Sequence, residues 1–419
     1  MSRLFATIAA ALLSFQLAAQ PFADSLELSK MPSCARPELS VLTFPAGRAA
    51  QNAFYAKLDS IAAGRHEAVN IWHVGGSHVQ AAVLPERIMY DLGSLPKMQN
   101  ADRGFFFPKR LAATNGERGY RFATEGSWEA PMLTKSSKVE KPRYGITGFG
   151  ARTSDSTAGV TLYTDADSTH RWEFNRLRVL GYGSSSGTYP YVLKGADTLS
   201  FVVDPATSSY VFGMGGFVDS VKVCFNIPEG ETFVLNGLEP MAGQSGINYF
   251  ASGVNGASVT SWADQCVDLQ RDLQLVRPDL VIFGLGINDS ATTAKLFKPE
   301  KFKANYRRLV AMIQKVSPDC AFIFLTNNDS YRYVKRGMTY NENAVAVRTA
   351  MMELAEEFGG CVWDLYGVMG GAHTVLKWRD AGLIKPDKLH FTEEGYTLIA
   401  DMICDAIVDD RLKNGGPAL

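Results

Sequence analysis

The sequence predicts an α/β protein built around a parallel sheet, with an all-β segment inserted into it. Three observations lead to this prediction. The C-terminal part alternates near-continuous apolar runs with amphipathic stretches, a similar apolar run lies far upstream at 68–77, and short β-rich runs fill the segment between them. Apolar strands separated by amphipathic helices are typical of a parallel sheet that is covered on both faces.

The first element is a predicted signal peptide over residues 1–20. One early arginine precedes an apolar run at 4–17, and the small residues Ala18 and Ala19 follow it. This is the pattern of a secretory signal that is cleaved near Ala19 or Gln20. The run is shorter than the roughly 20 residues of a membrane-spanning helix. We therefore expect an exported protein, periplasmic or secreted, with no membrane span.

The first part of the α/β domain is expected at 35–114. Its strand, AVNIWHVGGS at 68–77, ends in two glycines, Gly75 and Gly76, and the serine Ser77 follows at the start of a helical stretch. Glycine permits a tight turn. The sequence therefore predicts a strand-to-helix turn that exposes the Ser77 hydroxyl.

An all-β sandwich or jelly roll is predicted at 115–243. Turn residues separate its β-rich runs, among them 171–183, 190–204 and 208–227, and no long helical pattern appears between them. Because α/β elements flank this segment on both sides, its simplest interpretation is an insertion into the α/β domain.

The second part of the α/β domain is expected at 244–419. It begins with a short strand and a turn within 247–262. Strands are then predicted at 278–289, 320–329 and 361–368, and helices at 298–316, 342–359 and 392–410, the last of which starts at a threonine cap.

Composition excludes several function classes. Lys plus Arg (42) and Asp plus Glu (43) nearly cancel, so the charge balance gives no reason to expect a nucleic-acid partner. The six cysteines have no metal-ligand spacing, and no glycine-rich phosphate loop lies in a strand–helix frame. We expect no cofactor and no metal. Cys320 and Cys361 are one plausible disulfide pair in an exported protein, and buried free thiols are equally plausible.

Candidate catalytic residues follow the predicted strands. Ser77 follows the first strand, Gly256 the second and Asn288 the third, while Asp387 and His390 precede the last helix. Ligands of parallel sheets bind at the carboxyl ends of the strands, so these side chains are expected to meet there. The alternatives are a helix cap for Ser77, a surface histidine, a loop aspartate and ordinary turn residues.

The chemistry that needs these residue types is acyl transfer to a serine. A serine hydroxyl is a weak nucleophile until a histidine accepts its proton and a carboxylate orients that histidine, here His390 and Asp387. The developing oxyanion needs preorganised donors. The backbone N–H groups of Ser77 and Gly256 and the side-chain amide of Asn288 are the expected donors.

These four stretches, in this order, resemble the GDSL/SGNH hydrolases. Ser77 matches the serine nucleophile of that family, Gly256 its oxyanion glycine, Asn288 in GIND its asparagine, and Asp387 with His390 its final Asp-x-x-His pair. The resemblance implies a flavodoxin-like three-layer α/β domain. One position departs from the family pattern, because Gly76 stands where the family has an aspartate that is thought to brace the serine turn.

The wider layout is similar to that of exported peptidoglycan O-acetylesterases, which carry a carbohydrate-module-like β domain at the same place. This resemblance implies removal of an O-acetyl group from a polysaccharide, either peptidoglycan or a plant or host glycan. Two alternatives remain open: a polysaccharide O-acetyltransferase with the same triad, and a catalytically weak glycan-binding protein. His78 is expected either to line the pocket or to pack, and Trp378 either to contact sugar or to pack.

Overall fold

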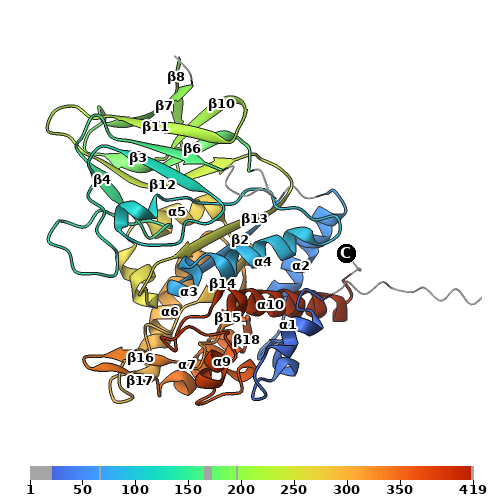
Figure 1. Ribbon diagram of the computed structural model, residues 1–419. Helices are drawn as coiled ribbons and strands as arrows, with labels where there is room; N and C mark the ends of the chain where they lie inside the picture. Colours follow the sequence, from blue (N-terminus) through green and yellow to red (C-terminus); the bar gives the residue numbers. More distant parts are fainter. Residues whose placement is uncertain (1–20, 66–67, 165–171, 195–196, 417–419) are drawn as a thin grey trace, which may run out of the picture.

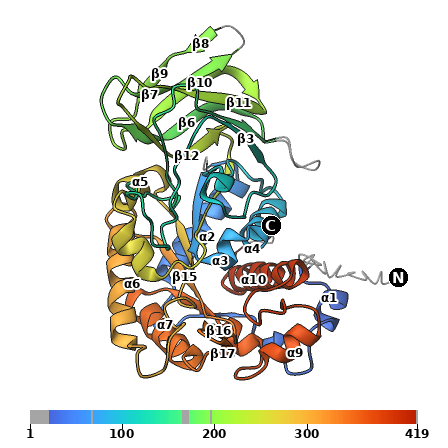
Figure 2. The same ribbon diagram turned by 60° about the vertical axis from the view of Figure 1, so that its left-hand side comes forward.

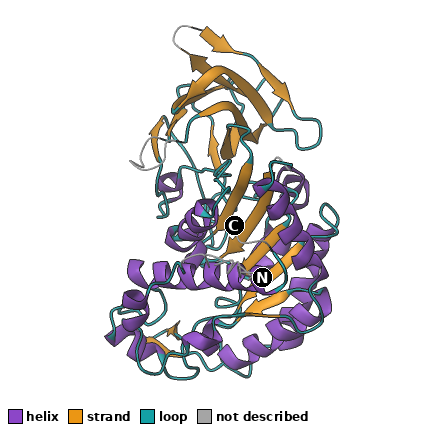
Figure 3. Cartoon of the chain, turned by 90° about the vertical axis from the view of Figure 1, so that its right-hand side faces the viewer, coloured by secondary structure: helices purple, strands orange, loops and turns teal. Residues whose placement is uncertain are grey.

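The computed structural model of the protein describes residues 21–65, 68–164, 172–194 and 197–416. The predicted signal peptide lies outside these residues. In the described part of the chain, no helix has the combination of length and apolar character that crossing a bilayer requires. Figure 3 shows two parts of the chain: an upper part of strands and loops, and a lower part in which helices surround a sheet.

A six-stranded sheet forms the centre of the lower part (Figure 1). Its strand order is β1 (Leu42–Thr43), β18 (Cys361–Trp363), β15 (Ala321–Leu325), β14 (Leu280–Gly284), β2 (Ala68–Gly75) and β13 (Gly246–Gly253). Only β1 pairs antiparallel to its neighbour, and the other pairs are parallel. The predicted α/β fold with a parallel sheet is therefore confirmed.

Helices cover both faces of this sheet because its strands are apolar on both sides. Neighbouring residues of β2 face opposite cores: Ile71 packs in one apolar cluster and Trp72 in the other, and both are fully buried. The first face is covered by α2 (Ala49–Ala62), α4 (Val83–Ser94) and α10 (Glu393–Lys413), and the second by α5 (Leu269–Val276), α6 (Pro299–Gln314) and α7 (Ala344–Phe358). Figure 2 shows α5 and α6 on one side and α4 and α10 on the other.

After α4, the segment that leads to β13 forms two five-stranded antiparallel sheets. One has the order β4 (Ala151–Thr153), β12 (Phe233–Met241), β6 (Phe174–Gly183), β10 (Tyr210–Val218) and β9 (Phe201–Val203). The other has β3 (Arg121–Glu125), β5 (Gly159–Tyr163), β11 (Ser220–Asn226), β7 (Tyr189–Lys194) and β8 (Asp197–Leu199). Residues of both sheets, such as Leu177 and Val223, share one apolar cluster. The described residues of 121–241 contain no α-helix.

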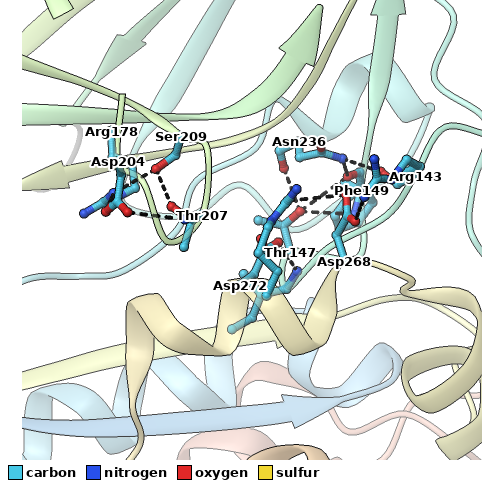
Figure 4. A network of polar contacts seen from close by, with 12 residues as sticks. Arg143, Thr147, Phe149, Arg178, Asp204, Thr207, Ser209, Asn236, Asp268 and Asp272 are labelled. Atoms are coloured by element: carbon cyan, nitrogen blue, oxygen red, sulfur yellow. Dashed lines mark hydrogen bonds and ion pairs between the residues drawn. The ribbon is translucent and has the colours of Figure 1, made fainter. Parts of the chain in front are cut away.

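A polar junction joins these two sheets to α5 (Figure 4). The Nδ2 atom of Asn236, which is 2% exposed on β12, donates to the carbonyl oxygens of Arg143 and Phe149, at 2.9 Å each. Arg143 forms an ion pair with Asp268, and Asp272 on α5 accepts a hydrogen bond from the N–H of Ile146. The contacts of Arg143 with Asp268 and of Ile146 with Asp272 connect the loop before β4 to α5, and Asn236 connects the same loop to β12. Together they fix the position of the β sheets on the α/β part.

At β18 one expectation needs correction, and the structure decides between two alternatives for the cysteines. The strand predicted at 361–368 ends at Trp363, and α8 (Leu365–Val368) follows, because the N–H of Tyr366 donates to the Thr326 side chain instead of continuing the ladder. The disulfide considered between Cys320 and Cys361 is absent, and all six cysteines are free thiols. Cys361 pairs in register with Ile323, which places Cys320 three residues along the neighbouring strand.

Candidate active site

Ser77 lies at the carboxyl end of β2, where the central strand turns into the short helix α3 (Ser77–Gln80). A side chain would not fit at Gly75, because a Cβ atom there would lie 2.3 Å from Val79 Cγ2 and 2.9 Å from the Gly284 carbonyl oxygen. The close approach of β14 thus requires glycine before the serine. Ser77 itself is half-buried, so its hydroxyl is at the surface of the sheet edge.

The structure brings Ser77, His390 and Asp387 together. His390 Nε2 lies 2.8 Å from Ser77 Oγ, across 313 residues of sequence, and His390 Nδ1 lies 2.7 Å from Asp387 Oδ2. The other carboxylate oxygen, Asp387 Oδ1, accepts hydrogen bonds from the N–H groups of Leu389 and His390, at 3.0 Å each. The loop therefore presents its carboxylate and imidazole in one fixed arrangement.

The electrostatics of the pair favour an ionised carboxylate. Partial burial raises the pKa of Asp387, but the hydrogen bonds and charge of His390 and the N–H of Leu389 outweigh it and lower this pKa to about 2. An ionised Asp387 accepts a hydrogen bond from the N–H group at His390 Nδ1. The lone pair of the neutral imidazole is then on Nε2, which faces the Ser77 hydroxyl.

Gly256 and Asn288 lie beside the serine turn. Gly256 is exposed and has a φ of +80°, a conformation that glycine adopts without strain. Asn288 Nδ2 donates to the Ala257 carbonyl oxygen at 3.0 Å, and its second N–H remains available. Within the described chain, no hydrogen bond engages the backbone N–H of Ser77 or Gly256. Three donors beside one serine can stabilise an oxyanion.

Gly76 occupies a confined position in this cluster. A Cβ atom at this residue would lie 2.9 Å from Asn288 Nδ2 and 3.3 Å from the Ala257 carbonyl oxygen. The hydrogen bond between these two atoms is thus packed directly against the glycine. A side chain at position 76 would have to displace the Asn288 amide in this structure.

Two residues at strand ends, Asp289 and Asn328, connect the loops of the site. The Asp289 carboxylate accepts the N–H of Val259 at 3.2 Å from both oxygens, and burial raises its pKa to about 6 against that hydrogen bond. Asn328 Nδ2 donates to the carbonyl oxygen of Leu389, in the loop of Asp387 and His390, at 3.0 Å. The sequence indicates that Asp289 and Asn328 follow strands of the sheet. It does not indicate which loop each side chain contacts.

The other candidates have packing contacts. Trp378 is fully buried and its Nε1 donates to the Met369 carbonyl oxygen at 3.0 Å, so it does not offer a sugar platform. His78 Nδ1 lies 2.8 Å from the Tyr396 hydroxyl, and its ring centroid lies 5.4 Å from that of His390. Burial and the nearby His390 lower the pKa of His78 to about 3. No group of three or more metal-ligating side chains occurs among the described residues.

One protein-family model matches part of this chain. Residues 230–398 match the model of the GDSL-like lipase/acylhydrolase family, a range that includes Gly256, Asn288, Asp387 and His390. The resemblance to GDSL/SGNH hydrolases noted in the sequence is confirmed by this match. A search of curated proteins finds no match.

One solved structure shares the fold of this chain over most of its length. A peptidoglycan O-acetylesterase has a TM-score of 0.68 and 18% identity, and the likeness covers 89% of this chain and 99% of that one. An acetyl xylan esterase, AlAXEase, has a TM-score of 0.29 and 16% identity over 38% of this chain and 79% of its own. Axe2, an acetylxylan esterase from Geobacillus stearothermophilus, has a TM-score of 0.30 and 18% identity over 39% and 73%. The SGNH hydrolase fold expected from the sequence is confirmed.

Proposed function

We propose that this protein is a secreted serine esterase that removes O-acetyl groups from a polysaccharide, with peptidoglycan as the substrate. The observation that carries the proposal is the continuous hydrogen-bonded chain from Asp387 through His390 to Ser77. A serine that merely caps a helix does not need a histidine and a carboxylate aligned behind its hydroxyl.

The first half of the reaction acylates the serine. Ser77 Oγ attacks the acetyl carbonyl carbon while His390 Nε2 accepts the hydroxyl proton, and Asp387 stabilises the resulting imidazolium. The carbonyl oxygen becomes an oxyanion, which the N–H groups of Ser77 and Gly256 and the Asn288 amide receive. The ester C–O bond then breaks, the sugar oxygen takes the proton from His390, and acetyl-Ser77 remains.

The second half repeats these steps with water. His390 removes a proton from a water molecule, the hydroxide oxygen bonds to the acetyl carbon, and the same donors hold the second oxyanion. Collapse releases acetate and returns the proton to Ser77 Oγ. An acetyltransferase would use a sugar hydroxyl in place of water at this step.

The substrate is taken from the similarity to a peptidoglycan O-acetylesterase over most of this chain, together with the signal-peptide pattern. We propose that the surface of the two antiparallel sheets helps to hold the glycan, as a carbohydrate module would. Export to the periplasm or beyond would place the enzyme where peptidoglycan is accessible.

The test is acetate release from p-nitrophenyl acetate, O-acetylated peptidoglycan and acetylated xylan, for the wild type and Ser77→Ala. We expect the variant to lose about 10³-fold or more in kcat/KM, because the nucleophile is absent. A wild type no faster than the variant on every ester would contradict the proposal and favour a glycan-binding role. Acetylated product formed with an added glycan acceptor would indicate transfer.

A further inference from the structure

An open groove of about 520 Å³ lies beside the oxyanion loop. Its lining consists of Arg110, Ala113, Thr114, Asn115, Lys135 and Asn255. The lining thus contains two cations and three hydrogen-bonding side chains, and no carboxylate. Arg110, Asn115 and Lys135 are exposed, so a ligand in solution can reach them.

The groove is joined to the candidate active site by Asn255. This residue directly precedes Gly256, and its backbone N–H donates to Gln80 Oε1 at 2.5 Å, on the same short helix as Ser77. Its carbonyl oxygen accepts the Thr134 hydroxyl at 2.7 Å. A ligand that contacts Asn255 in the groove would therefore lie one residue from an expected oxyanion donor, Gly256.

Hydrogen bonds hold the walls of the groove in place. Asn255 Nδ2 donates to Thr114 Oγ1 at 3.1 Å and to Asn115 Oδ1 at 3.0 Å. Gln80 Nε2 donates to Thr114 Oγ1 and to the Asn115 carbonyl oxygen, at 2.8 Å each. The polar floor is thus built before any ligand binds, which lowers the cost of ordering it on binding.

The two cations of the groove, Arg110 and Lys135, have no charged or hydrogen-bonding side-chain partner in the described part of the chain. Among the described residues, neither the Arg110 guanidinium nor the Lys135 ammonium forms an ion pair or a hydrogen bond. The Glu117 carboxylate accepts the backbone N–H of Arg110 at 3.4 Å, but Glu117 does not line the groove. By contrast, the neighbouring Lys109 turns inward, and its Nζ atom donates to the Gly116 carbonyl oxygen at 3.0 Å.

We propose that this groove binds a carboxylate on the glycan next to the acetylated sugar, with Arg110 and Lys135 as specificity-determining residues. This inference rests on the proposed esterase function and narrows its substrate to acidic, carboxylate-bearing glycans. Arg110 can bind a carboxylate bidentately and Lys135 adds a point charge. The carboxylate is either on the sugar itself or on an attached peptide.

The test compares acidic and neutral substrates for the double variant Arg110→Gln/Lys135→Gln. We expect kcat/KM on O-acetylated peptidoglycan to fall about tenfold or more, and to fall with added salt in the wild type only. Activity on acetylated xylan and p-nitrophenyl acetate stays within about twofold, because neither charge contacts the reacting atoms. The matched control is Lys30→Gln, an exposed lysine on the C-terminal cap of α1 (Ser25–Ser29).

Two further arms separate the sources and the failures. The first arm compares O-acetylated glycan strands with and without their peptides. If the loss of kcat/KM in Arg110→Gln/Lys135→Gln disappears when the peptides are removed, the peptide supplies the carboxylate, and if the loss persists, the sugar does. Binding of acidic glycan fragments to Ser77→Ala, measured by calorimetry, tests the groove even if no ester is cleaved. Equal affinity with and without Arg110→Gln/Lys135→Gln, or an equal loss on neutral and acidic esters, would overturn the inference.

Discussion

At position 76, the available space determines what the chain tolerates. The family resemblance associates this position with an aspartate that braces the serine turn. Here Gly76 is packed against the hydrogen bond between Asn288 Nδ2 and the Ala257 carbonyl oxygen. An aspartate at position 76 would thus have to occupy space that the Asn288 amide already fills.

We predict that Gly76→Asp lowers kcat on p-nitrophenyl acetate by about tenfold or more, because a displaced Asn288 amide is a lost oxyanion donor. Gly76→Ala should cause a smaller loss in the same direction. The matched control is Gly213→Ala, since a Cβ atom at Gly213 meets nothing within 4 Å. Faster turnover by Gly76→Asp would contradict this prediction and indicate that an aspartate at position 76 braces the serine turn without displacing the Asn288 amide.

The buried imidazole of His73 predicts acid sensitivity. His73 is fully buried on β2, its Nδ1 atom lies 2.8 Å from the Tyr249 hydroxyl, and burial lowers its pKa to about 3. An unfolded histidine has a pKa near 6.5. Between pH 6.5 and pH 3 the unfolded chain therefore holds a proton that the folded chain does not, so the free energy of unfolding falls as the pH falls.

Urea unfolding at pH 7 and pH 5 measures this effect. Each such histidine contributes up to about 1.4 kcal/mol per pH unit, and His78, whose pKa is also lowered, acts in the same direction. His73→Asn retains a polar group near Tyr249 and should reduce the pH dependence. An unchanged slope for His73→Asn would show that His73 is protonated in the folded state.

At the scale of elements, the oxyanion donors depend on contacts between loops. Asp289, after β14, accepts the N–H of Val259 and so ties the loop of Asn288 to the loop of Gly256. We predict that Asp289→Ala lowers kcat about tenfold with little change in KM. The substitution misaligns the oxyanion donors, whereas the contacts that bind the substrate are unchanged.

Asp289→Asn is the conservative counterpart, since its amide oxygen can still accept the Val259 N–H, and it should recover much of the rate. Asp264→Ala is the control, because the one side-chain partner of Asp264 among the described residues is Arg308, in an exposed ion pair. A kcat for Asp289→Ala equal to that of the wild type would exclude a positioning role.

The elements that the sequence predicts well are those with a clear period. The helices expected at 298–316, 342–359 and 392–410 correspond to α6, α7 and α10, whose apolar stripes reach the cores. Short elements are missed. The hairpin of β16 (Tyr331–Val334) and β17 (Gly337–Tyr340) and the helix α9 (Val375–Asp380) span too few residues to display a period.

On the scale of the whole molecule, the β sheets and the α/β part are expected to unfold together. Every residue of β12 is buried, and Asn236 on this strand satisfies two backbone carbonyl groups at the junction. We predict one calorimetric transition. We also predict a loss of about 2 kcal/mol in the free energy of unfolding for Asn236→Ala, which removes both hydrogen bonds and leaves the Arg143 carbonyl oxygen without its Asn236 donor.

Asn226→Ala provides the comparison for this prediction. Asn226 is exposed on β11 and donates only to the Gly187 carbonyl oxygen within the same pair of sheets, so its loss should cost less. Two separate transitions in the wild type would contradict cooperative unfolding of the two parts.

The gathering of the candidate site could be predicted because parallel strands bring their carboxyl ends to one edge. His390, 313 residues from Ser77, lies before α10 and does not follow a strand, so the rule alone does not place it. The rule places Ser77, Gly256 and Asn288, each of which follows a strand of the sheet. It does not place the loops that carry Arg110, Thr134 and Lys135, which have no period and are fixed by single hydrogen bonds such as that of Thr134 to the Asn255 carbonyl oxygen. The groove beside the oxyanion loop is visible only in the folded chain.

Acid-quenched mass spectrometry can show whether Ser77 Oγ receives the acetyl group. Wild-type protein is mixed with p-nitrophenyl acetate, quenched within the first turnovers and digested. We expect one acetyl group on the peptide that contains Ser77, and none there in Ser77→Ala or His390→Ala. Ester cleavage by the wild type without acetylation of Ser77, or with acetylation of another residue instead, would contradict the account.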